Sequence, residues 1–287
     1  MEKPWPMTLS SISRASQVRT VTATEHLRRM RGGSQAHLMK CSDGSLAVVK
    51  FRNNPQHMRI LANDMLASRL AEHVGLSVPN VLIVEVSDFL VQHSPDLTMQ
   101  RLGKTIPCEP GLQFGSQYVV SPFEGQVFDY LPPVILERVR NLGTFAGMLA
   151  MDKWTGNADG RQATFHRKMR ERRYTAAFID QGYCFNGGEW TFEDRALQGV
   201  YAQNEVYTSV IGWSSFEPWL SRIEQIDEHF VCVIAREIPL RWYGSDWAAL
   251  EQLVEKLLNR RGTVLIKALI DAFRLSVRKP FPNWTQM

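Results

Sequence analysis

The fold is indicated most clearly by the stretch Ala176-Ala177-Phe178-Ile179-Asp180-Gln181-Gly182. The apolar residues before Asp180 predict a buried strand, which delivers a carboxylate to its own end. Gly182, two positions further on, permits a sharp change of chain direction. This arrangement suits a magnesium ligand, and a purely structural Asp-x-Gly turn is the alternative.

Upstream of that strand, Asp152 and Asn157 lie five positions apart. They follow residues 132–151, which we expect to form a helix that begins at a proline, and they fall in the polar residues 152–160, which we expect to form a loop. The same Asp-x-x-x-x-Asn spacing occurs in kinase catalytic loops, where the Asp accepts the proton of the substrate hydroxyl and the Asn binds magnesium. Capping of a helix end and a turn is the alternative.

A β-hairpin fits between Asn157 and Asp180, which are 23 residues apart. We expect its strands at residues 163–165 and 174–179, joined by a basic turn. Such a hairpin would return Asp180 to the side of Asn157, so that both side chains could bind the same metal.

The N-terminal part of the chain contains a glycine turn and a lysine on a strand. Strand candidates at residues 18–27, 36–40 and 46–51 are separated by a turn at residues 32–35 and by an Asp-Gly turn, which predicts a hairpin. Glycines in the first turn would allow its amides to lie over phosphates, and Lys50 on the last strand could neutralise their charge. The alternative is that Lys50 lies on an edge strand and reaches solvent.

A prominent helix is predicted at residues 55–74, closed by Gly75. Its apolar residues recur at three- and four-residue steps, and Asp64 is our preferred carboxylate for pairing with Lys50, ahead of Glu72; an exposed Asp64 is the alternative. We expect further strands at residues 78–86 and 117–120. From Phe216 onward the chain is mainly helical, most clearly at residues 247–259 and 263–277.

The order of these features resembles the protein-kinase-like fold. The family that the sequence resembles most is the bacterial HipA-like kinase family, and the resemblance to phosphatidylinositol 3- and 4-kinases is more distant. It covers roughly residues 30–224 and is carried by Val49-Lys50-Phe51-Arg52-Asn53-Asn54-Pro55-Gln56-His57, Leu66-Ala67-Ser68-Arg69-Leu70-Ala71, Gly75-Leu76-Ser77-Val78-Pro79 and Phe178-Ile179-Asp180-Gln181-Gly182-Tyr183. Two departures from ordinary protein kinases are Ala150-Met151 before Asp152, in place of His-Arg, and Gln181 in place of Phe.

The resemblance implies an α+β, bilobal fold. Residues 1–122 would form a β-rich N-lobe with one main helix, and residues 123–287 a mainly helical C-lobe. It implies ATP and Mg²⁺ as cofactors, Lys50 and Asp152 as catalytic residues, and Asn157 and Asp180 as metal ligands. The residues implied to contact the nucleotide are Gly32, Gly33, Ser34, Gln35, Lys50, Asp64, Gln117, Tyr118 and Val119.

The function implied is an ATP- and Mg²⁺-dependent phosphotransferase with a hydroxyl acceptor, for which we favour a protein Ser or Thr. A pseudokinase or nucleotide-binding scaffold that acts through a protein partner is one alternative, and a lipid or small-molecule kinase is another. A regulatory protein partner is also compatible with the resemblance.

Composition and charge narrow the class of protein further. The chain has 287 residues, of which 44% are hydrophobic and 22% charged, which excludes a mostly disordered or fibrous protein. The four cysteines show no metal-ligand spacing, and the sequence has neither an apolar run of about 20 residues nor a secretory signal, so we expect a cytoplasmic protein without a membrane span. The net charge of +4 is too small to indicate nucleic-acid binding, although basic residues gather at residues 1–31 and 161–173.

Overall fold

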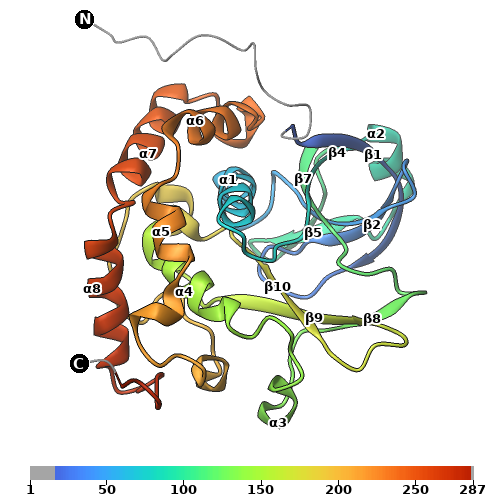
Figure 1. Ribbon diagram of the computed structural model, residues 1–287. Coiled ribbons are helices and arrows are strands. Elements are labelled where there is room, and N and C mark those ends of the chain that lie inside the picture. The colour runs from blue at the N-terminus through green and yellow to red at the C-terminus, as the bar shows by residue number, and fades with distance from the viewer. Residues whose placement is uncertain (1–16, 286–287) are drawn as a thin grey trace, which may run out of the picture.

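A closed five-stranded sheet forms the N-terminal part of the protein in the computed structural model, which describes residues 17–285 (Figure 1). Its strands are β1 (Arg19–Arg29), β2 (His37–Cys41), β3 (Leu46–Lys50), β4 (Val81–Val86) and β7 (Gly111–Gln117), in the order β1-β2-β3-β7-β4. The predicted hairpin is confirmed, since β2 pairs antiparallel with β3. Because β3 also pairs with β7, Lys50 does not lie on an edge strand. The first sixteen residues of the basic stretch 1–31 lie outside the described residues.

A short helix and a hairpin that we did not predict lie against this sheet. They are α2 (Asp88–His93) and the strands β5 (Thr98–Arg101) and β6 (Lys104–Pro107). The imidazole of His37, fully buried, connects the hairpin to β2: its Nε2 lies 3.1 Å from the carbonyl oxygen of Thr98, and its Nδ1 lies 2.9 Å from Nε2 of His26. Burial, together with the neighbouring His26, lowers the pKa of His37 to about 4.

We expect His37 to make the fold sensitive to acid. The unfolded chain takes up a proton near the ordinary pKa of 6.5, whereas folded His37 takes it up only near pH 4, so the free energy of unfolding should fall as the pH falls through this window. The full effect is on the order of 3 kcal/mol. Urea unfolding across this range should give a shallower pH dependence for His37→Gln than for the wild type. Replacing the exposed His229 with Gln should leave the dependence unchanged, and equal slopes for all three proteins would contradict the assignment.

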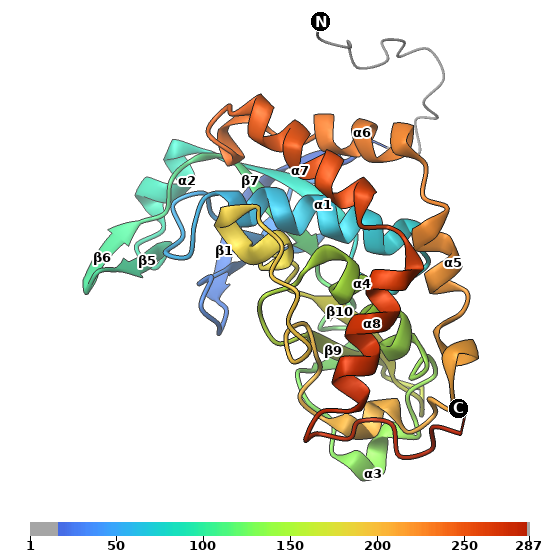
Figure 2. The same ribbon diagram turned by 90° about the vertical axis from the view of Figure 1, so that its left-hand side faces the viewer.

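Helix α1 (Arg59–His73) lies between the closed sheet and the C-terminal helices (Figures 1 and 2). It is buried continuously from Ile60 to Ala71, so its polar side chains face protein on every side. The helix ends as predicted, because Gly75 has a φ of 85°, in the left-handed region that favours glycine.

The C-terminal part combines a three-stranded sheet with helices. The sheet has the order β10-β9-β8, with β8 (Gly125–Phe128), β9 (Gln162–Lys168) and β10 (Thr175–Ile179). The predicted hairpin of β9 and β10 is confirmed, with Gln162 opposite Ile179. The α-helices are α3 (Pro133–Leu136), α4 (Thr144–Thr155), α5 (Trp219–Glu224), α6 (Glu228–Arg236), α7 (Trp247–Asn259) and α8 (Thr263–Arg274), and the 3-10 helices are η2 (Cys184–Glu189), η3 (Asn204–Tyr207), η4 (Trp213–Phe216) and η5 (Leu240–Trp242). The α+β class is as predicted, as is the helical character after Phe216.

The expectation of one helix over residues 132–151 is wrong. The structure has α3 and α4 in this region, and residues 138–141 run beside the start of β10 instead. The amide of Tyr174 donates to the carbonyl of Arg138, and the Asn141 side chain bonds both backbone groups of Ala176. These bonds with a distant part of the chain outweigh the local helical pattern.

Two boundaries were also misplaced. The strand expected at residues 117–120 is β7, which ends at Gln117; its glycines hide the strand pattern, and a Cβ at Gly115 would lie 2.4 Å from the Val84 side chain. The loop expected at residues 152–160 begins later, because α4 continues to Thr155 and ends at Gly156, whose φ is 59°. Asp152 therefore lies in a helix.

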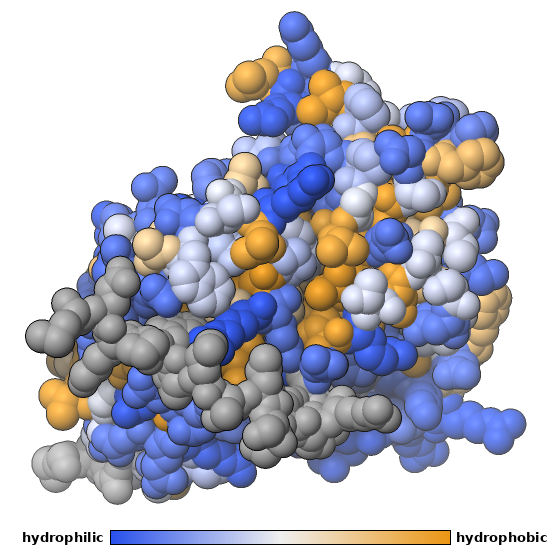
Figure 3. Space-filling view, turned by 90° about the horizontal axis from the view of Figure 1, so that it is seen from above, coloured by the Kyte–Doolittle hydropathy of each residue, from blue (hydrophilic) through white to orange (hydrophobic). Residues whose placement is uncertain are grey.

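Two hydrophobic cores hold these elements. The smaller fills the closed sheet, and the larger joins α1 to the C-terminal helices and to β10. Seen from above, polar side chains cover much of the surface, with a group of apolar ones near the middle of this face (Figure 3). Within residues 17–285, no helix is both long and apolar enough to cross a membrane.

Candidate active site

Lys50 links the closed sheet to α1 and to the end of β10. Its Nζ donates to a carboxylate oxygen of Asp64 at 2.7 Å and to one of Asp180 at 2.7 Å. The structure thus contains the Lys50–Asp64 pair that the helix spacing favoured, and Asp64 is not exposed. Burial alone would lower the pKa of Lys50, but the two carboxylates raise it above its ordinary value. Lys50 is therefore held as a cation between two carboxylates.

The two carboxylates beside Lys50 differ in their electrostatics. Burial raises the pKa of Asp64 to about 6, against the opposing effect of Lys50. Lys50 instead lowers the pKa of Asp180, so this side chain is the more firmly ionised of the two. Asp180 is also the one that reaches the pocket, with its side chain 22% exposed.

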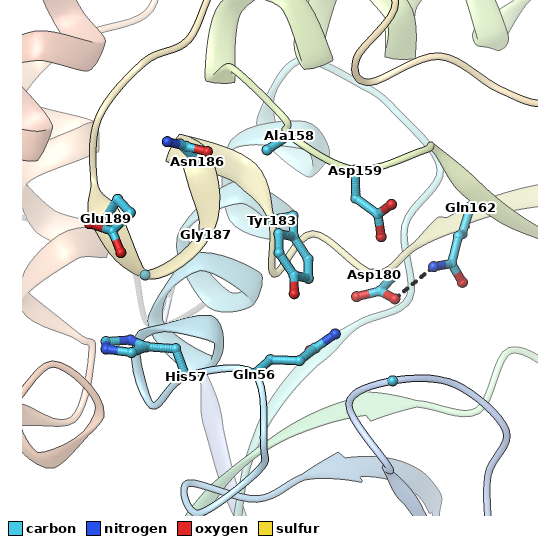
Figure 4. A pocket seen from close by; sticks show the side chains of 12 residues that line it. Gln56, His57, Ala158, Asp159, Gln162, Asp180, Tyr183, Asn186, Gly187 and Glu189 are labelled. Atoms are coloured by element: carbon cyan, nitrogen blue, oxygen red, sulfur yellow. Dashed lines mark hydrogen bonds between the residues drawn. The ribbon is translucent and has the colours of Figure 1, made fainter.

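A pocket of about 540 Å³ opens in front of Asp180 (Figure 4). The carboxylates of Asp159 and Asp180 both face it, and Gln162 donates to Asp180 at 2.9 Å. Gly33 of the glycine turn also lines this pocket. The remaining lining residues are Gln56, His57, Ala158, Tyr183, Asn186, Gly187, Gly188 and Glu189. The pocket is therefore polar and acidic, with a glycine turn and a paired lysine beside it.

Asp152 and Asn157 do not reach this pocket. Asp152 is 1% exposed and Asn157 2% exposed. The Asp152 carboxylate forms a buried ion pair with Arg161, and the Asn157 amide donates to Asp152 at 2.9 Å. The hairpin returns Asp180 to the side of Gln162. The roles predicted for Asp152 at the acceptor and for Asn157 at the metal therefore find no support in where these side chains lie.

Only some of the residues predicted to contact the nucleotide lie at the pocket. Gly33 lines the pocket, and Lys50 and Asp64 lie directly behind it. Ser34 is buried beside Gly33, and Gly32 has a φ of 121°. The Gln35 side chain instead bonds both backbone groups of Gln100 in the β5–β6 hairpin. Gln117, Tyr118 and Val119 do not line the pocket, and the amides of the first two donate to carbonyls of Asn80 and Leu46.

Sequence reasoning missed Asp159 and Gln162. Both lie after α4 has ended and before or at the start of β9, where side chains can face the cleft. Gly156 was the available indication: a glycine that closes a helix places the loop after it, and Asp159 is the first carboxylate in that loop. The Asp-x-x-x-x-Asn spacing drew attention to Asp152, which does not line the pocket, and not to Asp159, which does.

Helix α1 also fixes one wall of the pocket. Asn63, fully buried, donates to the carbonyls of Gly182 at 2.8 Å, Cys184 at 3.1 Å and Gly187 at 2.7 Å, and accepts from the indole of Trp190 at 2.7 Å. The segment after Asp180 contains several non-glycine residues in the left-handed region, which is costly without such support. They are Phe185, Asn186 and Trp190. One buried asparagine thus holds an irregular segment against α1.

The oxygen-bearing side chains of the pocket can be compared with the ligands that Mg²⁺ binds in proteins. Asp180 offers a carboxylate and Gln162 an amide oxygen, and no group of three or more His, Cys, Asp or Glu within residues 17–285 could hold a metal. Mg²⁺ commonly binds through one or two carboxylates, with substrate phosphates and water completing its shell. Asp180 and Gln162 line the pocket and fit such a site, whereas Asn157 is 2% exposed and does not line the pocket.

Comparisons with known proteins show a kinase-like fold. Solved structures with a similar fold are a proinflammatory kinase, CtkA, from Helicobacter pylori (TM-score 0.56, 14% identity, 90% of this chain and 100% of that chain), the Golgi casein kinase (0.51, 11%, 94% and 78%) and Fam20 from hydra, solved with sugar (0.50, 10%, 90% and 86%). At these identities the likeness shows the fold alone, which is a kinase-like one. A search of curated proteins found no match.

The family comparison goes further than the fold. Residues 23–274 match the family described as HipA-like kinase. This match spans most of the chain, so the protein belongs to the HipA-like kinase family, and by family it is a kinase. The resemblance inferred from the sequence is confirmed.

Proposed function

We propose that this protein transfers the γ-phosphate of ATP to a hydroxyl group of a protein Ser or Thr, with Mg²⁺ as cofactor. One observation carries the proposal: a single pocket is lined by Asp180, Asp159, Gln162 and Gly33, and Lys50 lies directly behind Asp180 in an ion pair. We also propose that residues 1–122 and 123–287 act as two lobes, with the nucleotide between them.

We assign a separate role in phosphoryl transfer to each of these residues according to its position at the pocket. Gly33, without a side chain, lets the backbone of its turn approach the phosphates, and Lys50 compensates their negative charge. Asp159 has one carboxylate oxygen bonded by the amide of Gly160 at 2.7 Å, which orients the other toward the pocket. We assign Asp159, in place of Asp152, to orient the acceptor hydroxyl and to take its proton.

Asp180 and Gln162 would hold Mg²⁺ together with the ATP phosphates. When bound, the metal neutralises charge on the phosphates during transfer. Asp180 is prepared for this because Lys50 keeps its carboxylate ionised. Positioning and charge compensation, supplied by residues already fixed in hydrogen bonds, therefore account for the chemistry.

A protein acceptor is supported by the fold comparison, in which one similar structure bears the name casein kinase. An open, polar pocket of this size also admits a single side chain presented by another protein. A cytoplasmic location and a regulatory protein partner stay predictions.

The proposal is tested with purified full-length protein, ATP and MgCl₂. We expect ATP with Mg²⁺ to stabilise the fold against heat, by about 2.7 kcal/mol when ligand is present at 100 times its Kd. We also expect ADP release and phosphoserine or phosphothreonine on casein or on the protein itself, read by mass spectrometry. Stabilisation without transfer would identify a nucleotide-binding scaffold, and transfer only to lipid or small-molecule hydroxyls would identify the other alternative.

A further inference from the structure

A buried hydrogen-bonded set lies directly behind the pocket and consists of Asp152, Asn157 and Arg161. The side chains of Arg161 and Asp152 are 2% and 0% exposed, so both charges are removed from water. Asp152 raises the pKa of Arg161 above its ordinary value, against the lowering caused by burial. Removing two charges from water costs free energy, and a buried ion pair of this kind need not stabilise the fold.

Two members of this set, Asn157 and Arg161, are each bonded to the backbone at one of the pocket carboxylates. Asn157 accepts through Oδ1 from the amide of Asp159 at 3.1 Å, while its Nδ2 donates to Asp152 at 2.9 Å. Arg161 donates through Nε to Asp152 at 2.9 Å, and its Nη1 donates to the carbonyls of Ile179 at 2.9 Å and Asp180 at 3.4 Å. Asp152 therefore joins the backbone of Asp159 to the backbone of Asp180.

The backbone at Asp180 requires such support. Its φ is 61°, in the left-handed region, where a non-glycine residue is strained. The turn points the carboxylate away from the strand direction and into the pocket (Figure 4). The Arg161 guanidinium bonds the carbonyls of Ile179 and Asp180 and so fixes the direction in which the Asp180 side chain leaves the backbone.

The surrounding chain packs closely on the set. Gly199 has a φ of 63°, and a Cβ there would lie 2.7 Å from Cβ of Asp152 and 3.4 Å from that of Asn157. The amide of Gly199 also donates to the carbonyl of Asp159 at 2.9 Å. Asp152 and Asn157 therefore have little freedom to move.

We infer that Asp152, Asn157 and Arg161 are positioning residues for phosphoryl transfer: they set the two pocket carboxylates, Asp159 and Asp180, relative to each other without touching either substrate. This inference rests on the proposed function, because it assigns the acceptor hydroxyl to Asp159 and the metal to Asp180. It also explains why a sequence pattern typical of catalytic residues appears one layer behind the pocket.

The first test replaces Asn157 with alanine, which removes both hydrogen bonds and introduces no charge. We expect kcat to fall by about 10–100-fold, the usual cost of losing a group that orients a ligand, with little change in the KM for ATP. The matched control is Asn141→Ala. Asn141 also makes two bonds to the backbone, with Ala176 at 2.9 and 2.8 Å, but it lies at the other end of β10.

The control separates positioning from stability. Both variants should melt at a lower temperature than the wild type, and only Asn157→Ala should lose kcat to the stated extent. An equal loss of kcat in both would show that Asn157 serves stability alone and would overturn the inference. In an Asp159→Asn background, Asn157→Ala should cost much less than it does alone, because it acts through a carboxylate that is already gone.

The second test removes both buried charges together, as Asp152→Asn with Arg161→Gln, so that no unpaired charge is left in the core. Its readout is binding of Mn²⁺ with ADP, measured by electron paramagnetic resonance, which needs no turnover. We expect the metal affinity to fall by about 10–100-fold, because Asp180 loses its orientation. Unchanged affinity in a folded double variant would overturn the role assigned to Arg161.

The experiments distinguish failure of the proposed function from failure of the positioning role inferred for Asp152, Asn157 and Arg161. If the wild type binds Mn²⁺ with ADP but transfers no phosphate to any acceptor, the proposed function fails. The metal affinity of the double variant then tests the positioning role of Asp152 and Arg161: a lower affinity supports it, and an unchanged affinity overturns it.

Discussion

Asp180→Asn is expected to lower the rate of phosphoryl transfer by about 10³-fold or more, with the protein still folded. Among residues 17–285, this carboxylate is the one charged group that both lines the pocket and pairs with Lys50. Its loss removes the main oxygen donor for the metal, and charge compensation at the transferred phosphate is worth factors of this size. Steady-state kinetics with ATP and MgCl₂ measure the effect.

The fold should tolerate this change. An asparagine at position 180 can still accept the hydrogen bond from Lys50, and Lys50 keeps its ion pair with Asp64. Thermal melting without nucleotide should therefore stay close to that of the wild type. The matched control is Asp271→Asn, which weakens only a half-buried ion pair with Arg274 on α8 and should keep its activity. Near-normal transfer by Asp180→Asn would remove this residue from the mechanism.

Asp159→Asn should lower kcat by about 10²–10⁴-fold, the range for loss of a general base. The asparagine can still accept from the amide of Gly160, so its position is kept and only its ability to take a proton is lost. Because Asp159 is assigned to the acceptor hydroxyl, the KM for ATP and the metal affinity should change little. This pattern differs from that of Asp180→Asn, which weakens metal binding.

Asp129→Asn is the control for this variant, since Asp129 is an exposed carboxylate outside the pocket. It should behave as the wild type. A variant Asp159→Asn with unchanged kcat, beside an inactive Asp152→Asn that melts normally, would return the acceptor role to Asp152.

Local patterns were sufficient where an element contacts its neighbours through a regular apolar face. The period of residues 55–74 predicted α1, and the Asp-Gly turn predicted the pairing of β2 with β3. The same reasoning singled out Lys50 among apolar strand residues, Asp64 on the predicted helix and Asp180 at the end of a strand. The region between α3 and α4 was predicted wrongly for the opposite reason, since its backbone at Arg138 and Arg140 forms hydrogen bonds with the backbone of Tyr174, far away in the sequence.

Local sequence patterns could not predict which carboxylates of the candidate site face the pocket. A spacing of five residues does not reveal whether a carboxylate faces a cleft or a core, because this depends on where the preceding helix stops. Helix α4 runs one turn further than expected, and this extension turns Asp152 toward Arg161 and brings Asp159 to the pocket.

Residue patterns alone were sufficient to identify the kinase family, the α+β class, and the carboxylate and lysine that meet at the end of β10. Those conclusions depend on residue types at fixed separations, which local periodicity and a strand-ending Asp-x-Gly turn already encode. The three-dimensional packing of the chain was needed to see which carboxylate faces the pocket and which lies behind it. Burial and hydrogen bonding are properties of the packed chain, and the partners of Asp152, Asp159 and Asp180 are assembled from segments that meet only after folding.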